Sequence, residues 1–138
     1  MRRITIGMAA VFAALLVNGA ALAAKPTSSL DLVVLGTAPF TSAATSGTTS
    51  GATQGGQITF DVKTTQTTRP FVNVRCYQNG NFVYDGWQGF FVGYFTDPVY
   101  TLASDSWTGG AADCTARLVD GNDGKLRTLA TLAFHVSS

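Results

Sequence analysis

The chain of 138 residues carries nine Lys or Arg, eight acidic residues and one His, so its formal net charge is +1 at pH 7. A charge this close to zero excludes the clustered basic excess that nucleic-acid binding requires. All eight acidic residues are Asp, and the absence of Glu beside abundant Thr, Val, Phe and Gly favours strands and turns over helices.

Residues 1–23 have the pattern of a cleaved secretory signal peptide. Arg2 and Arg3 precede an apolar run that ends in the small-x-small sequence ALA at 21–23, although they fit a twin-arginine signal poorly. The run is too short for a membrane span, which needs about 20 apolar residues. We therefore expect Sec-type export with cleavage after residue 23 or 24. The mature chain, residues 24–138, would be one secreted, extracellular domain without a membrane span.

Two strands separated by a loop are predicted next. Residues 29–35 are rich in Leu and Val and predict the first strand. Residues 41–57 are rich in Thr, Ser and Gly and have too little apolar mass to order themselves, so we expect a flexible loop, either a plain linker or an O-glycosylated one. From 57 to 63 apolar and polar residues alternate, which predicts a half-buried strand with Ile58, Phe60 and Val62 facing the core.

A β-hairpin is predicted around Asn79-Gly80, because this dipeptide between two β-rich runs favours a type I′ turn. Facing residues share a side of the sheet. The two-residue turn predicts the facing pairs Gln78 with Asn81, Tyr77 with Phe82, Cys76 with Val83, Arg75 with Tyr84 and Val72 with Trp87. The core side would then hold Val72, Val74, Cys76, Val83 and Trp87, together with Asp85 near the strand end. The other side would hold Phe71, Asn73, Arg75, Tyr77, Phe82 and Tyr84.

The segment 86–100, GWQGFFVGYFTDPVY, is dense in aromatic residues but does not keep the alternation of a strand. We interpret it as a crossover from one sheet to the other. Aromatic side chains each bury 150–250 Å², so packing in the core or at the edge is favoured over exposure. The alternative is a ligand platform made by Trp87, Phe91 and Tyr94.

Two alternating strands complete the chain. Residues 112–119 place Ala112, Cys114, Ala116 and Leu118 opposite Asp113, Thr115, Arg117 and Val119, and 126–136 offer the apolar set Ala130, Leu132, Phe134 and Val136. Between them, 120–124 resembles part of a calcium loop but lacks the later Glu, so a hairpin turn is favoured and no metal site is expected. About seven strands in all predict an all-β antiparallel sandwich.

The only two cysteines, Cys76 and Cys114, are expected to form a disulfide, because an exported pair reaches an oxidising compartment. The segment SDSWTGGAADCTARLV, 104–119, resembles the E–F corner and F strand of immunoglobulin-like domains. The resemblance extends over 56–136 in strand order and includes small secreted bacterial sandwiches. It implies an immunoglobulin-like fold. Ala112 replaces the usual Tyr, and Cys76 fits strand C rather than B, so the bond would join neighbouring strands C and F.

Catalytic chemistry has little support in the sequence. His135 is the only histidine, and Asp113 and Thr115 could share its face, but Thr is a poor nucleophile beside a lone His. We expect no enzyme activity and no cofactor. Tyr and Arg are enriched at interfaces, so Arg75, Tyr77, Phe82, Tyr84 and Arg117 are the candidate site. The expected function is binding of an extracellular protein or a cell-surface partner. The alternatives are carbohydrate binding through exposed aromatic residues, and a small secreted enzyme or inhibitor.

Overall fold

The computed structural model describes residues 25, 27–36, 51–94, 97–122 and 125–138. The signal peptide predicted for 1–23 lies outside these residues, as does most of the loop predicted for 41–57. Within the described ranges, no helix has the length and apolar character needed to cross a membrane.

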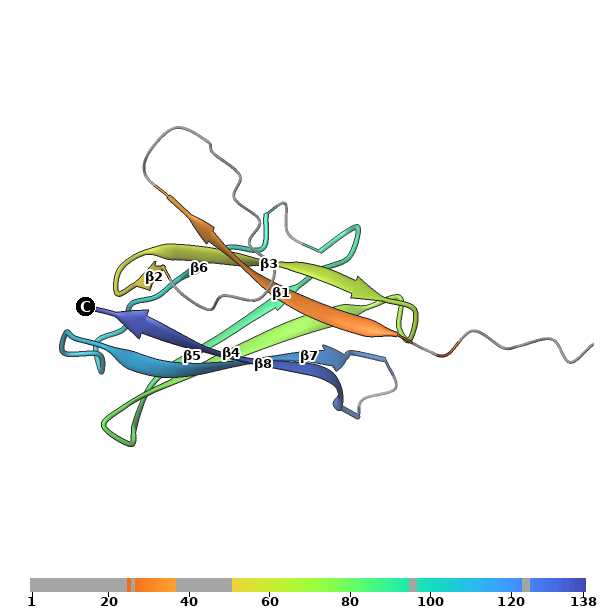
Figure 1. Ribbon diagram of the computed structural model, residues 1–138. Coiled ribbons are helices and arrows are strands. Elements are labelled where there is room, and N and C mark those ends of the chain that lie inside the picture. The colour runs from red at the N-terminus through yellow and green to blue at the C-terminus, as the bar shows by residue number, and fades with distance from the viewer. Residues whose placement is uncertain (1–24, 26, 37–50, 95–96, 123–124) are drawn as a thin grey trace, which may run out of the picture.

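The described residues form eight strands in two sheets that face each other as two layers (Figure 1). The three-stranded sheet has the order β1 (Ser28–Leu35), β3 (Gln57–Thr64) and β6 (Tyr100–Thr101). The five-stranded sheet has the order β2 (Ala52–Thr53), β8 (Arg127–Ser137), β7 (Ala112–Asp120), β4 (Pro70–Gln78) and β5 (Asn81–Gly89). All pairs are antiparallel except β2 with β8, which is parallel. The all-β prediction is confirmed, and β2 forms inside the range predicted as loop.

The core lies between the two sheets and follows the predicted alternation. Its buried members from the longer strands are Leu30, Ile58, Phe60, Val72, Val74, Cys76, Val83, Ala112, Cys114, Ala116, Leu118, Phe134 and Val136. Cys76 and Cys114 are facing residues of β4 and β7, and a disulfide joins them. The predicted bond between neighbouring strands is therefore confirmed.

Tyr100 links the two sheets through the centre of the core. It belongs to β6, yet its hydroxyl donates a 2.7 Å hydrogen bond to the carbonyl oxygen of Val72 in β4. Its ring is 2% exposed and packs edge-on against Phe60, and this burial raises the pKa of its phenol. Gly86 leaves space for the ring, since a Cβ at that position would lie 2.9 Å from it.

The hairpin between β4 and β5 has the predicted turn but a different register beyond it. Asn79 and Gly80 have φ angles of 50° and 81°, as a type I′ turn requires. Tyr77 faces Phe82 as predicted. The register then shifts, and Cys76 faces Tyr84 because Val83 is inserted as an extra residue.

This bulge reverses the predicted faces of the rest of β5. Arg75 faces Asp85, and Asn73 faces Trp87. The predicted pairs Cys76 with Val83, Arg75 with Tyr84 and Val72 with Trp87 are wrong, because a shift of one residue moves every later side chain to the other side of a sheet. Tyr84 therefore lies on the core side, while Asp85 and Trp87 lie on the outer side.

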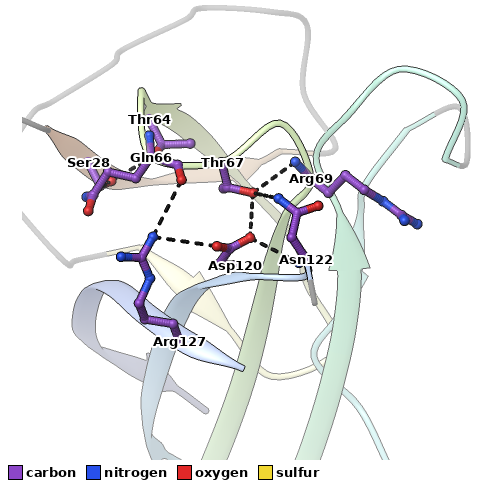
Figure 2. Close-up of polar contacts among 8 residues, drawn as sticks. All are labelled: Ser28, Thr64, Gln66, Thr67, Arg69, Asp120, Asn122 and Arg127. Carbon is purple, nitrogen blue, oxygen red and sulfur yellow. Dashed lines mark hydrogen bonds and ion pairs between the residues drawn. The ribbon is translucent and has the colours of Figure 1, made fainter. Parts of the chain in front are cut away.

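A polar cluster closes one end of the molecule, where the β3–β4 connection meets the end of β7 (Figure 2). The hydroxyl of Thr67 donates a 2.6 Å hydrogen bond to Asp120 and accepts one of 2.9 Å from the side chain of Asn122. Asp120 also accepts from the backbone N–H of Asn122 and lies 3.5 Å from Arg127. Its carboxylate thus serves the turn itself, and no group of three metal-binding side chains is present in the described residues.

Asp120 should contribute stability that depends on pH. The hydrogen bond from Thr67, then the N–H of Asn122 and the charge of Arg127, hold the pKa of this carboxyl below its usual 3.8. A lowered folded-state pKa stabilises the protein above the unfolded pKa, and the contribution disappears as pH falls through the folded value. We expect urea unfolding to show that Asp120→Asn loses stability near neutral pH and matches the wild type at pH about 2.

Asp105 provides the control, because its exposed carboxylate makes no hydrogen bond or ion pair with any other described residue. Asp105→Asn should retain the pH dependence of the wild type. If the free energy of unfolding of Asp120→Asn differed from that of the wild type by the same amount at every pH, the assigned role of the charge would be contradicted.

Candidate ligand-binding face

The candidate site is the outer face, which we define as the side of the five-stranded sheet that points away from the core. Alternation and the observed register assign its residues. They are Phe71, Asn73, Arg75 and Tyr77 of β4; Phe82, Asp85, Trp87 and Gly89 of β5; Asp113, Thr115, Arg117 and Val119 of β7; and Thr131, Ala133 and His135 of β8. The face therefore spans four strands.

Asn73 lies at the centre of a polar network on this face. Its side-chain oxygen accepts a 3.0 Å hydrogen bond from Arg117. Its amide nitrogen donates to Asp85 at 2.6 Å and to the carbonyl oxygen of Gly86 at 3.2 Å. Asn73 is 0% exposed although it points away from the main core. Both amide hydrogens and the oxygen are used, so Asn73 fixes the positions of Arg117 and Asp85.

Two arginines of this network keep hydrogen-bonding capacity toward solvent. Arg75 forms an ion pair with Asp85 through Nε at 3.6 Å, a distance too long for a hydrogen bond, and its side chain is 43% exposed. This Nε is buried and has no hydrogen bond in the described part of the chain, so the donors that Arg75 offers to solvent are those of its two terminal nitrogens. Arg117 makes no ion pair with any described residue and bonds only through one nitrogen to Asn73. A guanidinium has five N–H donors, so most of these donors are available to a ligand.

Aromatic rings stand beside and beyond the polar centre. Trp87 is opposite Asn73 and 38% exposed. Tyr77 and Phe82 pack together with ring centroids 5.5 Å apart and are 43% and 51% exposed. Side chains of this size on a solvent-facing sheet are available for contact with a partner.

The aromatic segment 90–94 folds back onto the other end of the face. Phe91 and Tyr94 pack edge-on against Phe71, with centroids 5.2 and 5.4 Å away. A Cβ at Gly89 would lie 2.6 Å from the ring of Tyr94, so the glycine allows this close approach. Phe90 instead packs against the main core. The segment thus divides between core and outer face, and it connects to β6 in the other sheet as predicted.

Most of the predicted site residues meet on this face. Arg75, Tyr77, Phe82 and Arg117 lie on it, and so does Trp87, which was predicted for the core. The two surfaces predicted separately, the hairpin face and the aromatic platform, are therefore one surface. Phe91 and Tyr94 cover its end.

Tyr84 is the predicted site residue that the structure removes from the outer face. It faces Cys76, contacts Trp107 with ring centroids 6.4 Å apart, and is half-buried. Burial raises the pKa of its phenol. The bulge at Val83 is the reason, because Val83 and Tyr84 then both turn toward the core.

Sequence reasoning missed Asn73 and Asp85 as site residues. The sequence did offer a sign that Asn73 is special, since it is a lone amide between Val72 and Val74. The alternation of the strand also placed it correctly on the outer side of the sheet. Asp85 was assigned to the core side, and only the observed register corrects this. Both corrections concern the same network.

His135 and Asp113 form a second polar feature at the far edge of the face. Their Nδ1 and Oδ1 atoms are 2.8 Å apart, and both side chains are exposed. With Tyr77, Thr115 and Ala133 they line an open pocket of about 410 Å³. The predicted sharing of one face by His135, Asp113 and Thr115 is confirmed, but among the described residues Thr115 makes no hydrogen bond to His135. A serine-hydrolase type of mechanism needs that contact.

Comparison with protein-family models, with curated proteins and with solved structures finds no match to this chain.

Asn73→Ala should lower the free energy of unfolding by about 1–3 kcal/mol, since it removes the three hydrogen bonds that the fully buried Asn73 amide makes to Arg117, Asp85 and the carbonyl oxygen of Gly86. Thr131→Ala on the same face is the control, because Thr131 is exposed and makes no side-chain hydrogen bond in the described residues. It should change stability by less than about 0.5 kcal/mol. Equal losses in urea unfolding of the two variants would contradict a fixing role for Asn73.

Proposed function

We propose that the protein is a secreted, non-catalytic binding module with immunoglobulin-like topology, and that it binds an extracellular partner through the outer face. Several observations support the topology and the export. The edge strand β2 of the five-stranded sheet pairs in parallel with the last strand, β8. The sheet with the order β2-β8-β7-β4-β5 faces the sheet with the order β1-β3-β6, as in immunoglobulin-like domains. The disulfide and the N-terminal sequence both favour an exported protein.

The observation that carries the binding proposal is the network around Asn73. A solvated sheet face needs no buried amide to hold an arginine and an aspartate in fixed positions. Here Asn73 holds Arg117 and Asp85 beside the exposed ring of Trp87. Fixed donors, a fixed acceptor and an exposed indole are the features of a preorganised binding surface.

Retention on insoluble extracellular material tests this proposal. The mature protein is mixed with the washed cell-surface and matrix fraction of cells that produce it, and the bound amount is measured over a range of concentrations. Arg75→Ala and Trp87→Ala should each weaken retention about tenfold or more, since central Arg and Trp contacts are worth about 1.4 kcal/mol or more at interfaces. Arg75→Ala should melt within a few degrees of the wild type, because partly exposed ion pairs add little stability. Circular dichroism should show that Trp87→Ala keeps the β-sheet fold, so that its loss of retention reports on binding.

The matched control lies on the other sheet. Lys63 is exposed, belongs to β3 and pairs with Asp61 at 2.7 Å, so Lys63→Ala removes a surface cation without touching the outer face. It should be retained like the wild type. If all three variants are retained equally, the outer face is not the binding surface.

A further inference from the structure

The order of polar and aromatic groups on the outer face indicates the chemical class of its ligand. In protein interfaces the centre is apolar and desolvated, and the rim is polar. The outer face has the reverse order, with a polar centre and aromatic ends. Its centre is the polar network of Asn73, Asp85, Arg75 and Arg117, with Trp87 at its side. The larger aromatic groups stand at the two ends, as Tyr77 with Phe82 and as Phe71 with Phe91 and Tyr94.

The charges on the strands of this face balance each other. Arg75 and Arg117 are matched by Asp85 and Asp113, so the four groups sum to zero. Such a face offers no excess charge to attract a strongly acidic or basic partner. It does offer donors and acceptors next to each other. A hydroxyl group both donates and accepts, so a ligand rich in hydroxyl groups can satisfy this surface.

Trp87 supplies the aromatic surface on which the apolar side of a sugar ring can lie. The C–H groups on one side of a sugar ring carry partial positive charge, and the face of an aromatic ring is negative. A sugar ring lying on the exposed part of Trp87 would bring its hydroxyl groups to Asp85 and Arg75, which are neighbours of Trp87 and Asn73 in the observed register. Apolar and polar contacts would then form on the same ring.

The face is long and open rather than a closed cavity. From Asn73 to Tyr77 it extends over five residues of β4, about 13 Å at strand spacing. Beside Tyr77 the small side chains Thr115 and Ala133 leave the open pocket of about 410 Å³. An extended chain of sugars fits this shape better than a single monosaccharide.

We infer that the ligand of the outer face is a neutral polysaccharide, bound along β4 and β5 with one sugar ring on Trp87. The inference rests on the proposed binding function and names the class of its partner. The hydrogen bonds come from Asp85, Arg75 and Arg117, while Asn73 holds two of these groups in position.

Affinity electrophoresis tests the inference directly. Native gels contain one neutral polysaccharide each, namely xylan, galactomannan, mixed-linkage β-glucan or hydroxyethylcellulose, and pectate and alginate gels serve as acidic comparisons. At least one neutral gel should retard the protein, and the retardation should persist in about 0.5 M NaCl because charge attraction contributes little. Trp87→Ala should reduce the affinity at least tenfold, Trp87→Phe should recover part of it, and Lys63→Ala should not change it. Retardation only by the acidic gels, or by none, overturns the inference.

A second measurement separates this inference from the proposed function. The insoluble extracellular fraction is treated with protease, or with periodate, which cleaves vicinal diols of sugars, before the wild-type protein is added. The polysaccharide inference predicts that retention survives protease and is lost after periodate. Loss after protease alone, with Trp87→Ala and Arg75→Ala still impaired on untreated material, overturns the inference and leaves the proposed function intact. If Trp87→Ala and Arg75→Ala are retained on untreated material as well as the wild type, both the inference and the proposed function are overturned.

Discussion

Tyr100→Ala is expected to lower the free energy of unfolding by about 3–5 kcal/mol, as for other large aromatic residues removed from a core. Tyr100 is 2% exposed, packs edge-on against Phe60 and donates its hydroxyl to the carbonyl oxygen of Val72. The substitution thus leaves a cavity and removes the hydrogen bond that joins the two sheets. Urea unfolding followed by circular dichroism measures the loss.

Tyr100→Phe separates the two contributions. It keeps the ring but leaves the carbonyl oxygen of Val72 without this donor, which should cost about 1–3 kcal/mol. The expected order of stability is wild type, then Phe, then Ala. If Tyr100→Ala lost less than about 1 kcal/mol, the ring could not be the centre of the core, and the packing described for β6 would be wrong.

Loss of the Cys76–Cys114 disulfide is expected to be similarly severe. The two cysteines are 38 positions apart in the sequence. In the chain-entropy account, opening a loop of this size lowers stability by about 4 kcal/mol, because the unfolded chain regains freedom. The double variant Cys76→Ala/Cys114→Ala should show this loss in urea unfolding. Wild-type protein unfolded with and without dithiothreitol provides the comparison without a change of sequence.

The same pair of experiments can contradict the assignment. If dithiothreitol leaves the urea midpoint unchanged, the bond does not constrain the unfolded chain. Non-reducing peptide mapping should recover one linked peptide pair that contains both cysteines, and two free thiols in the exported protein would be the opposite result.

Much of the fold follows from local patterns. Alternation correctly assigned the core residues of β3, β7 and β8, since one side of each strand packs against the other sheet. Val119, which alternation placed on the opposite side of β7, is nevertheless only 2% exposed. Asn79-Gly80 correctly predicted the hairpin turn, because both residues readily adopt positive φ. The disulfide followed from there being two cysteines on apolar positions of strands expected to be neighbours.

The bulge at Val83 could not be predicted from the sequence. In the run Phe82-Val83-Tyr84, all three residues favour strands, and any of them is acceptable on either side of a sheet. Burial of both Val83 and Tyr84 against the core decides the register, and this is a tertiary effect. The error reached the candidate site because it moved Tyr84 onto the outer face and Trp87 away from it.

The fate of the aromatic segment also depended on tertiary contacts. Nothing local distinguishes Phe90, which packs on the core, from Phe91, which packs on the outer face against Phe71. Composition predicted that these rings would be mostly packed. It could not predict that part of the packing extends the same face that carries Arg75 and Trp87.

Acrylamide quenching of tryptophan fluorescence tests most directly whether the outer face binds the ligand. The chain has two tryptophans, and Trp107 is only 4% exposed, so quenching in the free protein reports mainly on Trp87. Quenching is measured with and without the soluble polysaccharide or solubilised extract that retains the protein. We predict that saturating ligand lowers the quenching constant of the wild type, while Trp87→Phe shows little quenching in either state. Unchanged quenching of a fully bound wild-type protein would mean that the ligand lies elsewhere.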